Sequence, residues 1–253
     1  MQYGEIVHLG RHKLMCGDAT SREDVMRLVD GERVNLVLTD PPYGMKVQDK
    51  DGRNGSDCVV MPAKVKGEFN YGRKNPLFAK SYPVMKGDDT QETARKHYDI
   101  ARVLSKKFII WGGQYFAHFL PVNGGWIFWD KGMEKTDFSA GELAYKSWGK
   151  RLAYYRHVWN GVFRAGSKYL ELKSRIHPTQ KPVELHMKIL EDFTQPNDVI
   201  LDCFGGSGTT LIACEMTGRK CLMMEISSDY CDIIRERYTK LTEGGLFSGS
   251  SSE

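Results

Sequence analysis

The chain places a nearly continuous apolar run directly before two prolines, in Val34-Asn35-Leu36-Val37-Leu38-Thr39-Asp40-Pro41-Pro42-Tyr43. The β-branched and apolar character of residues 34–39 is typical of a strand that is buried on both faces. Two prolines in a row cannot continue a strand, because proline has no backbone N–H to donate to a neighbouring strand. The strand is therefore predicted to stop at Asp40, with a carboxylate at its carboxyl end.

The turn at residues 40–43 also has the chemistry of a binding site for a planar amine. Consecutive prolines hold the backbone near polyproline II, so the carbonyls of Asp40 and Pro41 have no obvious strand partner. A carboxylate and a bare carbonyl would accept the two hydrogens of an NH2 group, while the ring of Tyr43 stacks on the same molecule. From these four residues alone, a proline-ended strand with a buried tyrosine is an equally good interpretation.

A second short apolar stretch ends in the same way, in Asp198-Val199-Ile200-Leu201-Asp202, and Cys203-Phe204-Gly205-Gly206-Ser207-Gly208-Thr209-Thr210 follows it. A glycine-rich turn before a helix, here predicted over 209–217, lets a ligand approach the backbone closely and offers free N–H groups. The dinucleotide pattern GxGxxG would need glycine at 211, where leucine stands. The phosphate-loop pattern GxxxxGK would need glycine at 210, where threonine stands. Both common nucleotide-binding patterns are thus excluded.

The pattern that remains, Asp-x-Phe-x-Gly-x-Gly over residues 202–208, resembles the S-adenosylmethionine (SAM) loop of methyltransferases. Asp-Pro-Pro-Tyr precedes it in the chain, and His177-Pro178-Thr179-Gln180-Lys181-Pro182 comes shortly before it. With these three motifs in this order, the chain resembles the β-class SAM-dependent DNA amino-methyltransferases, the N6-adenine and N4-cytosine family. The resemblance covers most of residues 14–240 and is weak over 46–90, where nothing is carried over.

The resemblance implies an α/β fold of the SAM-dependent methyltransferase (Rossmann-like) type. This fold is a mixed, mostly parallel sheet with helices on both faces, here with a permuted motif order. Residues 1–243 would form a single catalytic domain with an inserted polar segment, 44–90, and a basic DNA-recognition segment, 146–176. The Gly/Ser-rich tail 244–253 is expected to be disordered.

The same resemblance implies roles for individual residues. The expected catalytic residues are Asp40, Pro41, Pro42 and Tyr43. The expected SAM-binding residues are Asp18, Asp40, His177, Thr179, Lys181, Asp202, Phe204, Gly205, Gly206, Ser207, Gly208, Thr209 and Glu225. For Glu225 the spacing agrees, because it lies 23 residues after Asp202, close to the distance at which an acid meets ribose hydroxyls in doubly wound folds. For Asp18 two interpretations stay open, a helix cap or an acid near the SAM adenine.

The implied activity is site-specific transfer of a methyl group from SAM to the N6 amine of adenine in a nucleotide flipped out of double-stranded DNA. Asp40 and the Pro41 carbonyl would accept the amine hydrogens and aim the nitrogen lone pair at the donor methyl. Methylation of cytosine N4 is the alternative, although that group of enzymes more often has serine at position 40. A non-catalytic SAM- or DNA-binding module also stays open, as does methylation of RNA or of a protein glutamine.

The charge of the chain is concentrated in one region. The formal net charge is only +4, but residues 146–181 hold nine basic residues against one acid, Glu171, and aromatic residues lie between them. Cations for phosphates and rings for unstacked bases suit a nucleic-acid surface, while a solvated basic face over an aromatic core is the plainer interpretation. The predicted DNA-binding residues are Lys146, Arg151, Arg156, Arg164, Lys168, Lys173 and Arg175.

Composition excludes several other classes of protein. A chain of 253 residues with 41% hydrophobic residues is long enough for a full α/β domain. No run of 18 apolar residues and no signal peptide is present, so a cytoplasmic protein is expected. The six cysteines lack the spacing of a metal site, so reduced core residues and no metal are expected. They also lack the Pro-Cys context expected for carbon-5 cytosine methylation, which argues against that reaction. A homodimer and a cognate restriction nuclease stay open.

Alternating strands and helices complete the predicted parallel sheet. The turn Gly112-Gly113-Gln114 either lines the same crevice as the two acidic turns or forms a plain turn. Further strands are predicted at 14–18, 107–111, 125–129 and 220–225, and further helices at 22–29, 90–104, 114–119, 182–193 and 228–241.

Overall fold

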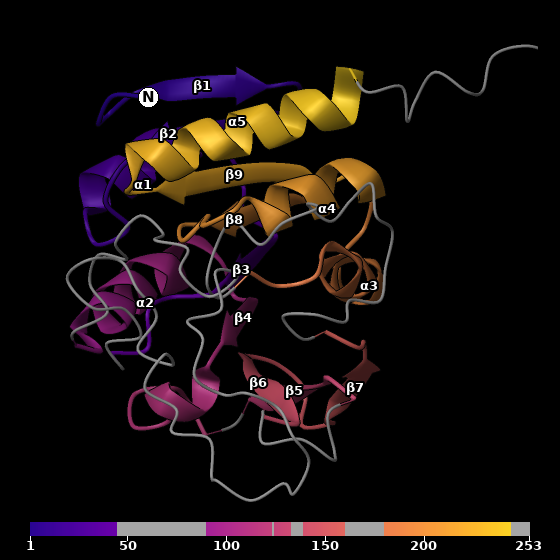
Figure 1. The fold of residues 1–253 in the computed structure, drawn as a ribbon. Coiled ribbons are helices and arrows are strands. Elements are labelled where there is room, and N and C mark those ends of the chain that lie inside the picture. The colour runs from indigo at the N-terminus through magenta and orange to yellow at the C-terminus, as the bar shows by residue number, and fades with distance from the viewer. Residues whose placement is uncertain (45–89, 123, 133–138, 160–179, 244–253) are drawn as a thin grey trace, which may run out of the picture.

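The computed structural model describes residues 1–44, 90–122, 124–132, 139–159 and 180–243 (Figure 1). Three predicted segments lie wholly or mostly outside the described residues. These are the inserted segment 44–90, of which only the two end residues are described, the recognition segment 146–176, of which 146–159 are described, and the tail 244–253. The strands are β1 (Ile6–Leu9), β2 (His12–Cys16), β3 (Leu36–Thr39), β4 (Phe108–Trp111), β5 (Gly125–Asp130), β6 (Gly141–Lys146), β7 (Ala153–Arg156), β8 (Val199–Asp202) and β9 (Lys220–Glu225). The helices are α1 (Arg22–Val29), α2 (Glu92–Leu104), α3 (Val183–Phe193), α4 (Thr209–Thr217), α5 (Ser228–Glu243) and the 3-10 helix η3 (Gly113–Phe116).

The strands of this described part form one nine-stranded sheet in the order β1-β2-β9-β8-β3-β4-β6-β5-β7. The five central strands from β2 to β4 run parallel to one another. β1 and β6 are antiparallel to their neighbours, and β7 pairs parallel with β5. The predicted mixed, mostly parallel α/β sheet is therefore confirmed.

Helices cover both faces of the sheet, as Figure 1 shows. On one face, Val25 of α1 belongs to the same apolar core as Val37 of β3. On the other face, Leu211 of α4 belongs to the same core as Leu36 of β3. Because successive side chains of a strand point to opposite faces, the continuous apolar run of β3 serves both cores.

The strand order diverges between β3 and β8, which are neighbours in space although they are far apart in the chain. Leu36 pairs with Ile200 and Val37 with Leu201. From β3 the chain continues to β4 on one side, and from β8 it continues to β9 on the other. Ligands of such sheets bind beyond the strand carboxyl ends at this kind of divergence. The turns after β3 and β8 meet at this point.

Elements with a clear apolar pattern have the predicted bounds. This holds for α1, α4 and β9, which span 22–29, 209–217 and 220–225. The N-cap of α1 is Ser21, whose side chain accepts from the Asp24 N–H at 3.2 Å. Pro182 was expected in the first turn of α3, and the structure places it one position earlier, as the N-cap.

Three strands are absent from the sequence prediction: β1, β6 and β7. β1 forms an antiparallel edge hairpin with β2, in which Ile6 lies opposite Met15. β6 and β7 are partly polar, and their strand conformation comes from pairing, β6 with β4 and β5 and β7 with β5, rather than from an apolar pattern. The first part of the predicted DNA-recognition segment is therefore part of the sheet.

The described cysteines are buried thiols, as expected for reduced core residues: Cys16, Cys203, Cys214, Cys221 and Cys231. Across the helices with assigned positions, none combines the length and the apolar composition that crossing a membrane requires.

Candidate active site

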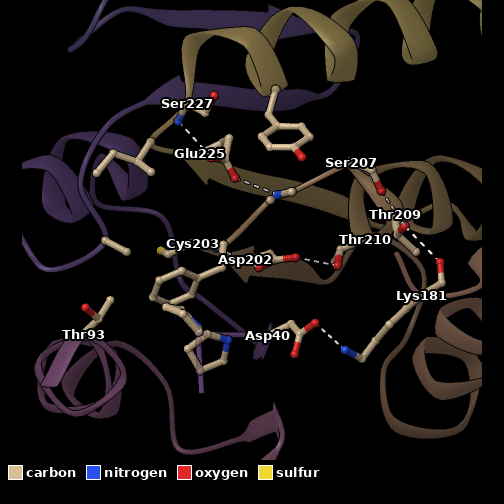
Figure 2. A pocket seen from close by; sticks show the side chains of 18 of the residues that line it. Asp40, Thr93, Lys181, Asp202, Cys203, Ser207, Thr209, Thr210, Glu225 and Ser227 are labelled. Carbon is tan, nitrogen blue, oxygen red and sulfur yellow. Dashed lines mark hydrogen bonds and ion pairs between the residues drawn. The ribbon is translucent and has the colours of Figure 1, made fainter. Parts of the chain in front are cut away.

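A cavity of about 1130 Å³, counting its open mouth, lies at the carboxyl ends of β2, β3, β8 and β9 (Figure 2). The acceptor turn after β3 and the glycine loop after β8 both contribute to its wall. Of the predicted residues, the wall contains Asp18, Asp40, Pro41, Pro42, Tyr43, Lys181, Asp202, Phe204, Gly205, Gly206, Ser207, Thr209 and Glu225. His177 and Thr179 lie outside the described residues.

The carboxylate of Glu225 is held by two backbone N–H groups at the end of β9. Gly206 donates to Oε2 at 2.8 Å, and Ser227 donates to Oε1 at 2.9 Å (Figure 2). Each carboxylate oxygen has further lone pairs, so a fixed Glu225 can still accept hydroxyl donors from the cavity. Gly206 has a φ of +51°, a conformation that side chains rarely adopt, and its N–H can therefore reach Glu225.

The glycines of the loop have different tasks. A Cβ at Gly205 would lie 2.9 Å from the Met223 side chain, so only glycine lets the loop pack on β9. Gly208 was predicted to bind the cofactor, but it is not part of the cavity wall. It is the N-cap of α4, with a φ of +82°, and a Cβ there would press on Ile234 at 3.0 Å. Its role in this structure is to turn the chain into the helix.

Asp202 lies below the loop and is almost fully buried. It accepts hydrogen bonds from Thr39 Oγ1 at 3.2 Å, Thr210 Oγ1 at 2.6 Å and the Phe204 N–H at 3.1 Å. Burial raises the pKa of Asp202 to about 7, although these three donors act in the opposite direction. Asp202 thus ties the two central strands together and titrates near neutral pH.

The raised pKa of Asp202 predicts a pH-dependent stability. Between about pH 4 and pH 7 the folded protein holds a proton on this carboxyl that the unfolded chain has released, so stability falls as pH rises. The slope attributable to this group approaches roughly 1.4 kcal/mol per pH unit. Urea titrations at pH 5 and pH 8 should show Asp202→Asn gaining stability relative to the unmodified protein as pH rises. A constant difference between the two proteins would contradict this assignment.

Asp40 lies at the end of β3 with both carboxylate oxygens occupied. The Tyr43 hydroxyl donates to Oδ1 at 2.6 Å, and the Lys181 ammonium forms an ion pair with Oδ2 (Figure 2). Lys181 also lies 3.5 Å from Glu142 on β6. Lys181 was predicted to border the cofactor; it does line the cavity, but its ammonium is held by two acids. Glu142 itself is absent from the sequence prediction.

The ring of Tyr43 is packed tightly on the turn after β4. It stacks on Tyr115 with centroids 5.1 Å apart and meets Phe116 edge to face at 6.0 Å. A Cβ at Gly112 would lie 2.2 Å from the Tyr43 ring, and Gly112 has a φ of +67°. The glycine turn at 112–114 was expected either to line the cavity or to be a plain turn. None of its residues is in the cavity wall, so the structure supports a plain turn, against which the Tyr43 ring packs.

Asp18 lies in the cavity wall rather than at the cap of α1. Its Oδ1 accepts from the N–H and the hydroxyl of Thr20, both at 2.8 Å. Because Ser21 is the cap, the cap interpretation of Asp18 is wrong, and its role near the SAM adenine stays a prediction.

Sequence reasoning missed several polar residues of the wall, among them the buried Thr210 and His186. Thr210 donates to Asp202, so its hydroxyl accepts from His186 Nδ1 at 3.2 Å. Burial and the charges of Lys181 and Arg237 lower the pKa of His186 to about 3, so the imidazole is neutral. The available signal was a histidine on the apolar face of α3, between Leu185 and Ile189.

The predicted DNA-binding residues are divided between two edges of the sheet. Lys146 lies opposite Ile109 and Gly125, at the amino ends of β4 and β5 and therefore away from the cavity. Its side chain is 5% exposed and covers the rings of Trp148 and Phe193, and burial lowers its pKa. This corrects the prediction that Lys146 binds DNA, because a buried ammonium cannot meet a phosphate.

Arg151 lies in the exposed loop after Lys146, at the same distant edge. Arg156 ends β7 opposite Asp130, at the carboxyl ends of the strands, and its guanidinium lies 3.6 Å from the Asp130 carboxylate. The remaining predicted residues, Arg164, Lys168, Lys173 and Arg175, lie outside the described residues.

A glycine loop with a fixed acid on the next strand, at the divergence point of a mostly parallel sheet, is typical of Rossmann-like folds that bind a ligand with a ribose. The family model described as DNA methylase, for N6 and N4 amines, matches residues 77–236, which is well over half of the chain. The chain belongs to this family of DNA amino-methyltransferases, which act on adenine N6 or cytosine N4. The predicted family is thus confirmed.

Related proteins agree over most of the chain. The Type II methyltransferase M1.MboII of Moraxella bovis is 41% identical, over 82% of this chain and 90% of its own. M.HpaI of Haemophilus parainfluenzae is 32% identical, over 89% of this chain and 73% of its own. The putative methylase YubD of Escherichia coli K12 is 28% identical over 81% and 82%.

Solved structures support the fold. The M1.HpyAVI–SAM complex has a TM-score of 0.52 at 17% identity, covering 88% of this chain and 97% of that one. The cytosine-N4-specific PvuII DNA methyltransferase has a TM-score of 0.51 at 16% identity, covering 96% and 94%. The family indicates SAM as the cofactor, as predicted from the sequence. The cavity fits such a ligand, because its wall combines the glycine loop at Gly205 and Gly206 with the fixed carboxylate of Glu225.

Proposed function

We propose that this chain transfers the methyl group of SAM to the exocyclic N6 amine of adenine in DNA. The observation that carries the proposal is that the acceptor turn of Asp40 and the glycine loop line one cavity (Figure 2). A methyl donor held by the loop and an amine held by the turn would meet at the carboxyl ends of the strands.

Glu225 and the glycine loop would hold the cofactor. The two N–H groups on Glu225 orient its carboxylate, which would accept the ribose hydroxyls, and Asp18 in the same wall would contact the adenine. When bound, SAM supplies an electrophilic methyl group on a sulfonium. The carboxylate of Asp202 is engaged by Thr39 and Thr210, so it supports the loop that surrounds the methionine end.

Asp40 and the Pro41 carbonyl would hold the target amine. The amine lone pair of adenine is delocalised into the ring, and two acceptors on its hydrogens favour the tetrahedral nitrogen that attacks the methyl group. The nitrogen becomes cationic as the methyl transfers, and the Asp40 carboxylate stabilises that charge. Asp40 need not be a strong base, because the amine proton becomes acidic only during the transfer.

The target base must leave the duplex to reach this cavity, at a cost of a few kcal/mol that stacking recovers. Tyr43 is our proposed stacking partner. Its hydroxyl lies on Asp40 Oδ1 in this structure, so the ring must shift when an amine takes that oxygen. Aspartate at position 40 supports adenine over cytosine, since the cytosine-N4 enzymes of the family more often have serine there.

Incorporation of a labelled methyl group into DNA distinguishes an enzyme from a non-catalytic binding module. We expect the protein to move label from methyl-labelled SAM into long mixed-sequence DNA, and to lose this activity when the demethylated product of SAM is added in excess as a competitor. A protein that binds SAM and DNA without incorporating label would be a non-catalytic module. Label in RNA or protein but not in DNA would indicate an RNA or protein methyltransferase and would contradict the proposal.

A pair of matched substitutions tests which edge of the sheet faces DNA. Arg156→Gln is expected to lower DNA affinity and to reduce the slope of log affinity against log salt by about 0.9, the loss of one phosphate contact. Arg151→Gln, at the opposite edge, should leave both unchanged. Fluorescence anisotropy with a labelled duplex at several salt concentrations gives both slopes. Equal slopes for the Arg156 variant and the unmodified protein would show that β7 does not contact DNA.

A further inference from the structure

A row of alternating charges leads from the acceptor turn to β5 and β6. Asp40 pairs with Lys181, and Lys181 Nζ lies 3.5 Å from Glu142 Oε2. The other oxygen of Glu142 pairs with Lys131. The Lys181 ammonium also lies 5.1 Å from the centroid of the Trp111 ring, and the side chain is 5% exposed. One buried ammonium is therefore shared by two carboxylates from different strands.

The Lys181 ammonium and the Glu142 carboxylate are both charged. Burial alone would lower the pKa of Lys181, but Asp40 and Glu142 outweigh burial and raise it. Burial alone would raise the pKa of Glu142, but Lys181 and Lys131 outweigh burial and lower it. The group next to Asp40 is thus a fixed positive charge, with its own counter-charge on the far side.

The position of Lys181 creates a chemical conflict for the proposed reaction. An ammonium on Oδ2 fixes the Asp40 carboxylate, which favours a preorganised acceptor. The same ammonium cancels part of the negative charge that Asp40 presents to the amine, and it repels the positive charge that develops on the amine nitrogen. A second carboxylate on Lys181 resolves this conflict, because it offsets the ammonium charge without touching the substrate.

We propose that Glu142 is a positioning residue for methyl transfer, which acts through Lys181. Glu142 shares the ammonium, so that Lys181 orients Asp40 without quenching its charge. The proposal rests on the proposed amine-acceptor role of Asp40 and adds a residue outside the three sequence motifs. A purely structural role for the Glu142–Lys181 pair is the competing explanation, and it predicts a loss of folding or of SAM binding instead.

Glu142→Gln removes the charge and keeps the shape of the side chain. We expect its single-turnover rate of DNA methylation to fall by about 10-fold, the effect of one unit charge several ångströms away at an intermediate dielectric. SAM affinity by calorimetry and DNA affinity by anisotropy should stay close to those of the unmodified protein. Glu236→Gln is the matched control, since it makes the same chemical change at an exposed glutamate of α5 that pairs with Lys240; its rate should stay close to the unmodified rate.

A double-mutant cycle tests whether Glu142 acts through Lys181. In a Lys181→Met background the ammonium is gone, so adding Glu142→Gln should change the rate little. An equal rate loss in both backgrounds, or a Glu142→Gln protein with full activity, would overturn the proposal. A melting curve is measured for each variant. If Glu142→Gln does not fold, Glu142→Asp takes its place, and because Glu142→Asp keeps the charge, it should keep most of the methylation rate. An unmodified protein that methylates no DNA would refute the proposed function itself, which is a different result.

Discussion

Replacing Asp40 by alanine is expected to slow single-turnover methylation by roughly 100-fold to 1000-fold, the usual cost of removing one preorganised electrostatic contact. Alanine removes both the acceptor oxygen and the charge that stabilises the cationic amine. Asparagine keeps one acceptor oxygen and loses the charge, so the rates should fall in the order Asp, Asn, Ala. SAM affinity should survive in both variants, because the cofactor site is built mainly from the turns after β8 and β9.

The structure adds a control that the Asp40 experiment requires. Asp40 is a partner of the buried Lys181 and of the Tyr43 hydroxyl, so alanine leaves a buried ammonium with Glu142 alone. Breaking a buried ion pair commonly destabilises a protein by several kcal/mol. Melting temperatures must therefore be measured with the rates, and rates compared well below the lower melting temperature. A folded Asp40→Ala protein that methylates at the unmodified rate would refute the acceptor role.

Replacing Glu225 by alanine is expected to weaken SAM binding by roughly 1 to 3 kcal/mol, or about 5-fold to 150-fold in dissociation constant. The substitution removes the ribose acceptors and also leaves the N–H groups of Gly206 and Ser227 without the carboxylate that accepts from them. Glutamine should fare little better, because its NH2 group would face one of those two donors. Calorimetry with SAM gives the affinities directly. Unchanged SAM affinity in both variants would leave Glu225 with a structural role in the loop.

The parts of the fold that sequence predicts best are those with local signals. α4 lies between two glycines with positive φ, Gly208 and Gly218, and both ends were predicted correctly. β6 and β7 have no such signal, because their mixed polar sequences become strands through pairing, β6 with β4 and β5 and β7 with β5. The basic residues among them suggested a DNA surface, whereas the Lys146 side chain is buried and packs over two aromatic rings.

The candidate site shows the same limit. The motifs gave Asp40, the glycine loop and Glu225, since each follows an apolar strand. The pairing of Lys181 with Asp40 joins residues 141 positions apart, and no local pattern indicates it. Glu142 belongs to no motif, and it reaches Lys181 only because β6 inserts beside β4. Charge networks of this kind follow from strand order, which a single sequence does not specify.

The most direct test of amine methylation at this cavity is to identify the methylated nucleoside. Long duplex DNA with all four bases is incubated with SAM that carries a deuterated methyl group, digested to nucleosides and analysed by mass spectrometry. The deuterium label distinguishes new methyl groups from those already in the DNA. We expect deuterated N6-methyldeoxyadenosine with the unmodified protein and a strong reduction with Asp40→Ala. Label on the N4 amine of deoxycytidine would contradict the adenine assignment, and DNA without label would contradict the proposed function as a whole.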